Sequence, residues 1–76
     1  MSELQKAFFL ISGKHEQRGQ KAAVARAMGI TRMAVNNWFS RGIDGAAAVS
    51  IWKASGRRID LVRLVEEGEE MKRRAA

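Results

Sequence analysis

Two short helical patterns that meet at a glycine constrain the fold of this chain more than any other feature. They occupy residues 21–40, KAAVARAMGITRMAVNNWFS. Gly29 separates them, and glycine adopts the left-handed conformation that ends a helix without a steric penalty at Cβ. Thr31 follows and can cap the second helix by accepting an amide hydrogen bond. Apolar residues at helical spacing give each helix one inward face: Val24, Ala25 and Met28 in the first, and Val35, Trp38 and Phe39 in the second.

The steric requirements of a helix-turn-helix are met in this stretch. Ala25 lies where the two backbones must cross closely, and Ile30 follows the glycine as a buried corner residue. Val35 and Trp38 supply the apolar face of the second helix. We therefore predict a helix-turn-helix, in which the second helix enters the major groove of DNA. An ordinary helical hairpin with a glycine C-cap is the alternative that the pattern leaves open.

Three more helical patterns flank this motif. One begins after Ser2, with Gln5 three residues later as a capping box, and ends at Ser12. Another covers residues 46–55, and a short one follows Asp60 as its cap. Proline and alternating strand-like runs are absent, so we predict an all-α domain of about five short helices. The core residues expected from these three helices are Leu4, Ala7, Phe8, Phe9, Ile11, Ala48, Ile51, Trp52, Leu61, Leu64 and Val65.

The chain ends in a strongly charged segment. An acidic block, residues 66–70, precedes the basic residues Lys72, Arg73 and Arg74. We predict a helix-turn-helix domain over residues 1–65 and a charged C-terminal tail or helix extension over residues 66–76. The two arginines could add DNA contacts, but a solvated terminus is the simpler interpretation. Trp52 could likewise belong to a dimer surface instead of the core.

Length and composition limit the chain to one small domain. A chain of 76 residues buries only about 60% of its unfolded surface, so dimerisation would add stability. The absence of cysteine excludes a disulfide framework and a thiolate metal site. The apolar runs are too short to span a bilayer, and the N-terminus lacks a signal-peptide pattern. We expect a cytoplasmic protein.

The positive charge is concentrated around the helix-turn-helix. Residues 17–58 contain eight basic residues and one acidic residue, giving +7, whereas the whole chain carries +6. A basic surface that coincides with this motif favours a polyanionic partner. A basic membrane-surface peptide is disfavoured, because the charges are not gathered on one face of a long amphipathic helix.

The outward face of the second helix, residues 31–40, predicts base contacts. An asparagine amide can bond adenine N6 and N7 together, a methionine can meet a thymine methyl group, and an arginine can reach guanine or a phosphate. Adjacent asparagines disfavour a helix, and such a local conflict is typical of functional sites. A fraying helix end near Ser40 is the alternative explanation for them. The residues expected at the bases are Arg32, Met33, Asn36 and Asn37.

Both ends of the motif carry candidates for contacts with DNA phosphates. Gln20 and Lys21 open the first helix, where free amides, the helix dipole and the side chains can all meet a phosphate. Arg41 follows the second helix and is well placed for the phosphate backbone. Thr31 and Ser40, at the two ends of that helix, complete the expected set.

The residues around the glycine resemble small phage Cro repressors and the related YdaS-type regulators. The similarity lies in residues 20–30, QKAAVARAMGI, and 34–38, AVNNW, which follow the family pattern Q-x-x-A-[LV]-A-x-A-L-G-[IV]-[ST]-x-x-A-V-x-x-W. Residues 51–59, IWKASGRRI, also resemble a family I-E-x-A-T-G-G-x-[VI] stretch. The resemblance implies a lambda repressor/Cro-like fold that binds a double-stranded DNA operator as a homodimer in a bacterial or phage-infected cell. It places the base contacts on Arg32, Met33, Asn36 and Asn37.

A Cro-type transcriptional repressor without catalytic activity is therefore the expected function. An antitoxin-like or anti-repressor protein-interaction module on the same helical scaffold is the alternative. An enzyme is disfavoured, because His15 lies alone in a polar loop at residues 14–19 and Asp44 and Asp60 lie in separate turns. No cofactor, metal or small-molecule substrate is expected.

Overall fold

A computed structural model describes residues 2–13 and 19–75, so His15 and most of the predicted polar loop lie outside the described residues. Over the described part, the chain forms helices and no strand, which confirms the all-α prediction. Each helix begins and ends close to its predicted bounds, except that the last is longer than expected. The helices are α1 (Glu3–Ser12), α2 (Gln20–Met28), α3 (Arg32–Arg41), α4 (Gly45–Ala54) and α5 (Leu61–Ala75).

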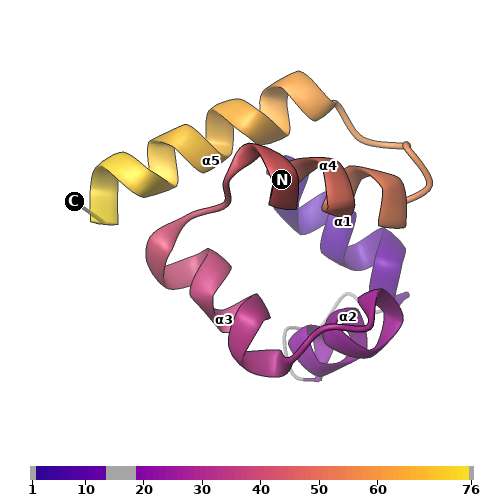
Figure 1. The fold of residues 1–76 in the computed structure, drawn as a ribbon. Coiled ribbons are helices and arrows are strands. Elements are labelled where there is room, and N and C mark those ends of the chain that lie inside the picture. Colours follow the sequence, from indigo (N-terminus) through magenta and orange to yellow (C-terminus); the bar gives the residue numbers. More distant parts are fainter. Residues whose placement is uncertain (1, 14–18, 76) are drawn as a thin grey trace.

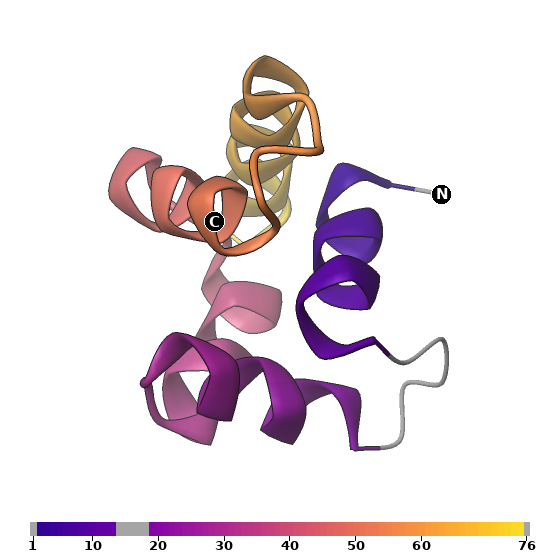
Figure 2. The same ribbon diagram turned by 90° about the vertical axis from the view of Figure 1, so that its right-hand side faces the viewer.

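The helices form two pairs joined by α1. The pair α2 and α3 lies at one end of the molecule, the pair α4 and α5 lies at the other, and α1 contacts members of both pairs (Figures 1 and 2). Helix α5 also contacts α3, so the two pairs meet directly at that point. The α2–α3 pair therefore packs against α1 and α5, and both of these helices also contact α4.

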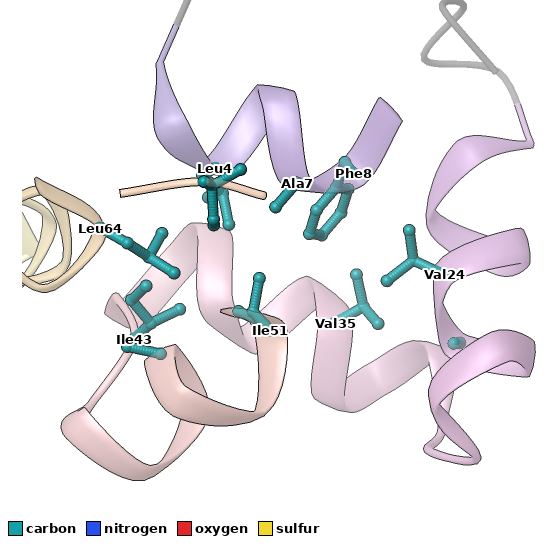
Figure 3. Packing of buried hydrophobic residues seen from close by; sticks show 11 residues of the cluster. Leu4, Ala7, Phe8, Val24, Val35, Ile43, Ile51 and Leu64 are labelled. Carbon is teal, nitrogen blue, oxygen red and sulfur yellow. The ribbon is translucent and has the colours of Figure 1, made fainter. Parts of the chain in front are cut away.

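One large, fully buried side chain from each helix builds the centre of the core (Figure 3). Burial of these side chains is the main stabilising contribution expected for a domain of this size. The apolar spacing predicted from the sequence is therefore confirmed in every helix. The five residues are Phe8, Val24, Val35, Ile51 and Leu64.

Three apolar residues that were predicted to face the core lie partly outside it. Val65 and Phe39 are exposed, and Phe9 is partly exposed. Each is one residue from a better buried neighbour on its helix, so the helix face that packs inward is narrower than predicted. Trp38 and Trp52 pack against the core, as expected.

The predicted helix caps are confirmed in the structure. The Ser2 hydroxyl accepts the Gln5 amide while the Gln5 side chain accepts the Ser2 amide, which completes the capping box. The Asp60 carboxylate accepts the Arg63 amide at 3.1 Å and so caps α5. Asp44, predicted only as part of a turn, caps α4 by accepting the Ala47 amide at 2.7 Å.

Helix α5 continues without interruption through the charged segment. Residues 66–75 are helical, as in the helix-extension alternative. The Glu67 carboxylate accepts the backbone amides of Glu3 at 2.7 Å and Leu4 at 3.2 Å, so it caps the N-terminus of α1. This long-range cap ties the charged part of α5 to the first helix.

Glu3 anchors the chain segment before α5 to α1. Its side chain accepts the Asp60 amide at 3.0 Å and pairs with Lys6 at 3.1 Å. The Asp60 amide, followed by the Lys6 ammonium group, lowers the pKa of the Glu3 carboxyl below its ordinary value of 4.5. The ionised carboxylate therefore stabilises the folded state.

This contribution should disappear at acidic pH. Because the folded-state pKa of Glu3 is lower than the unfolded one, its contribution is present above about pH 4.5 and is lost as the pH falls through the lowered value. Urea unfolding of the wild type and of Glu3→Gln across this range measures the effect. The stability difference between the two proteins should shrink below pH 4.5; a difference that stays constant would contradict the assignment.

Candidate nucleic-acid interface

The turn between α2 and α3 has the geometry that its glycine predicts. Gly29 adopts a left-handed conformation with φ of 68°. Its amide donates to the Arg26 carbonyl at 3.3 Å, and the Ile30 amide donates to the Ala25 carbonyl at 3.0 Å. These two hydrogen bonds form a Schellman motif, which satisfies the last carbonyls of α2 and redirects the chain. The Thr31 hydroxyl oxygen then caps α3 by accepting the Ala34 amide at 3.1 Å.

Two inward side chains fix how α3 is turned about its own axis. Val35 is fully buried, and Trp38 packs edge-on against Phe8 with ring centroids 6.2 Å apart. Phe39 also meets the Phe8 ring edge-on, at 5.4 Å, although 44% of its surface remains exposed. With these contacts in place, the opposite side of α3 must face away from the protein.

The four residues predicted to contact bases share that outward side. They lie at positions i, i+1, i+4 and i+5 of α3, which form a single stripe on a helix. All four are exposed, and their side-chain polar atoms make no hydrogen bond or ion pair within the described part of the chain. The Met33 side chain is 73% exposed. The stripe consists of Arg32, Met33, Asn36 and Asn37, and we call it the α3 stripe.

The N-terminus of α2 lies beside the C-terminal half of α3. The Lys21 ammonium group sits 4.6 Å above the centroid of the Phe39 ring, which places the start of α2 next to the α3 stripe. Gln20 is the first residue of α2 and is partly buried there. Arg41 is exposed in the last turn of α3. Candidate phosphate ligands thus flank the stripe from two helices.

The two hydroxyl groups of the predicted phosphate set differ in what they can donate. Thr31 uses its hydroxyl oxygen as an acceptor in the cap, so its hydrogen remains available for a phosphate. The Ser40 hydroxyl instead donates back to the carbonyls of Asn36 and Asn37, each at 3.4 Å. Ser40 must give up these bonds before it can donate to a phosphate.

A small pocket adjoins the start of α2. Its volume is about 150 Å³ and its lining includes Leu4, Phe8, Lys21 and Phe39. This volume is below the roughly 300 Å³ at which typical small-molecule sites begin. Among the described residues, no cluster of histidine, aspartate and glutamate side chains suits a metal ion. None of the described helices contains an apolar stretch of the length that a membrane span requires.

Comparison of the chain with protein-family models, with curated proteins and with solved structures finds no match.

Sequence reasoning missed two contacts that shape this interface. One is the Lys21–Phe39 contact, which joins the two helices of the motif. The other lies at the end of α3, where α5 crosses Gly42 so closely that a Cβ added there would lie 3.0 Å from the Lys72 backbone nitrogen. The sequence shows the basic residues 72–74, but their position beside the end of α3 depends on how α5 packs against the rest of the protein.

Proposed function

We propose that this protein is a sequence-specific DNA-binding regulator that places α3 in the major groove. The α3 stripe is the observation that carries the proposal. A buried face that includes Val35 holds α3 on the domain, while its polar outward face has no partner in the described part of the protein. The major groove of B-form DNA admits an α-helix and presents a distinct pattern of donors and acceptors at each base pair.

The side chains of the α3 stripe suit particular base edges. The amides of Asn36 and Asn37 can each donate to N7 and accept from N6 of an adenine. Met33 supplies an exposed apolar surface for a thymine methyl group, and Arg32 can donate two hydrogen bonds to a guanine. We therefore expect an A·T-rich recognition sequence with a flanking guanine.

Contacts to phosphates would fix the register of α3 in the groove. Lys21 and Gln20 at the start of α2, Arg41 at the end of α3, and the free hydroxyl hydrogen of Thr31 supply these contacts. A Cro-type repressor of this kind acts by occupying an operator. Two copies would read half-sites about 34 Å apart, one helical turn of DNA.

Substituting Asn36 tests the base-reading role of the α3 stripe. Asn36→Ala should weaken binding to the preferred sequence by about 1–3 kcal/mol, the value of one bidentate base contact. Binding to random-sequence DNA should change little, because that binding depends on phosphate contacts. Fluorescence anisotropy titrations with both DNAs measure the two affinities. An equal loss on both DNAs would remove Asn36 from the base-reading set.

Lys21→Ala is the matched control for this measurement. It removes a phosphate contact and should weaken binding to both DNAs alike. The negative slope of log K, the binding constant, against log salt should become less steep by about 1. The preference between the two DNAs should be retained. A loss of sequence preference in Asn36→Ala, together with its retention in Lys21→Ala, would distinguish base contacts from attraction to phosphate charge.

A protein-interaction module, antitoxin-like or anti-repressor-like, is the second candidate function. It is favoured by two exposed apolar side chains: Met33 in the α3 stripe, which is 73% exposed, and Phe39 beside it, which is 44% exposed. Exposed large apolar side chains are common where proteins bind one another. In that case the wild type would bind DNA without sequence preference, and Met33→Ala would weaken a protein complex instead.

A further inference from the structure

The basic end of α5 lies against the C-terminal end of α3. Gly42 ends α3, and a Cβ added to this residue would lie 2.9 Å from Cγ of Lys72 and 3.0 Å from its backbone nitrogen. No side chain larger than hydrogen fits between the two helices there. The C-terminal ends of α3 and α5 both lie at the left-hand edge of the molecule in Figure 1.

The docking of α5 fixes this basic end in place. A Cβ added to Gly68 would lie 2.6 Å from both the carbonyl oxygen and Cγ1 of Ile43, so the helix backbone rests directly on the segment after α3. Met71, one turn further on, packs against the core. Glu67 holds the same stretch of α5 to α1 through the cap described above. Residues 72–74 therefore extend from a docked helix.

The cations at this end of α5 have only weak partners. Arg73 and Arg74 pair with Glu70 at 3.3 Å and 3.6 Å, and the side chains are 74% and 77% exposed. Exposed pairs of this kind between neighbouring turns of a helix contribute little, because water and salt screen them. Lys72 is also exposed. All three cations can therefore exchange their present surroundings for a phosphate.

We propose that Lys72, Arg73 and Arg74 form a second phosphate-binding element, which contacts the DNA backbone beyond Arg41. This inference rests on the proposed function and extends it. Because α5 is docked at the end of α3, insertion of α3 into the major groove brings this element towards the strand that borders the groove. The element recognises phosphate charge and carries no base preference.

A charge-neutralised variant tests this element. Lys72→Gln/Arg73→Gln/Arg74→Gln removes three positive charges, while glutamine retains the Cγ group that rests on Gly42. It should bind DNA about tenfold or more weakly at moderate salt. The negative slope of log K, the binding constant, against log salt should become less steep by about 2 to 3. The preference for the selected sequence over random DNA should remain.

The matched control removes the same charge from the opposite end of the α4–α5 pair. Lys53→Gln/Arg58→Gln/Arg63→Gln neutralises three exposed residues, which lie in the last turn of α4, in the segment before α5 and in the first turn of α5. Arg63, the one of these three that lies in α5, is nine residues before Lys72, a rise of about 14 Å along the helix, which exceeds the Debye length of about 10 Å at 0.1 M salt. The control should retain affinity within about twofold. Equal losses in the two triple variants would overturn the second phosphate-binding element.

A gain of affinity provides a test that no folding defect can imitate. Glu70→Gln releases Arg73 and Arg74 and removes a negative charge next to the DNA, so it should tighten binding by about twofold or more. Unchanged affinity would overturn the second phosphate-binding element.

Failure of the proposed function would look different. The proposed function is wrong if the wild type binds the selected and random DNAs equally, or binds neither. If the wild type prefers the selected DNA but the α5 variants bind it as tightly as the control variant does, the proposed function stands and only the second phosphate-binding element is wrong.

Discussion

Phe8→Ala is expected to lower the free energy of unfolding by about 3–5 kcal/mol, as truncation of a buried phenylalanine does in other cores. The Phe8 side chain is 2% exposed and meets the rings of Trp38 and Phe39 edge-on. Its removal leaves a cavity between α1 and α3 and deletes the contacts that orient α3. Because domains of this size have only modest stability, much of the protein should be unfolded at 37 °C.

Urea unfolding followed by circular dichroism measures this loss. Met33→Ala is the control, since it also truncates a large apolar side chain but at a position that is 73% exposed. Its effect on the unfolding free energy should stay within about 0.5 kcal/mol. A loss below about 1 kcal/mol for Phe8→Ala would mean that the α1–α3 contact does not support the fold.

Gly68→Ala is expected to destabilise the protein by about 1–3 kcal/mol, the usual penalty for an overpacked core. In an exposed helix the same change would stabilise by about 1 kcal/mol, because alanine is the better helix former. Here the added Cβ would lie 2.6 Å from the Ile43 carbonyl oxygen. A backbone atom cannot rotate away as a side chain can, so α5 must shift from α3 and the core.

Gly45→Ala provides the matched control for this prediction. Gly45 is the first residue of α4, and an added Cβ would meet no atom within 4 Å. Alanine should therefore leave stability unchanged or raise it by up to about 1 kcal/mol. If Gly68→Ala were stabilising to the same extent, the close packing of α5 on the segment after α3 would be wrong.

Local patterns in the sequence predicted most of the fold because the interactions behind them are local. Apolar residues three and four apart identified the buried side chain of each helix, such as Val24 in α2 and Val35 in α3. The caps at Ser2 and Thr31 depend on atoms three residues away in the chain. Gly29 predicted the turn for the same reason, since its conformation is set by its own backbone.

The docking of α5 could not be predicted in this way. Its inward face includes Gly68, which no hydrophobic pattern would assign to a core, while Val65 turns outward. The acidic block suggested a solvated segment, yet Glu67 caps α1 from more than sixty positions away in the chain. These contacts depend on how helices far apart in the sequence pack together, and the spacing of apolar residues within one helix does not reveal that packing.

The candidate interface shows the same division between local and distant contacts. Assigning Val35 and Trp38 to the inside of α3 was enough to predict which residues form the outward stripe. The back-bonded hydroxyl of Ser40 and the contact of Lys21 with Phe39 required the structure. The placement of Lys72 against Gly42 required it too, because these residues are thirty positions apart.

Selection of bound sequences from a randomised pool of double-stranded DNA, at moderate salt, would show directly whether the α3 stripe reads bases in the major groove. The predicted result is enrichment of one sequence, with A·T pairs at the positions that Asn36 and Asn37 read and a two-fold repeat if two copies bind. Binding with no enriched sequence, or no binding, would contradict sequence-specific recognition by α3.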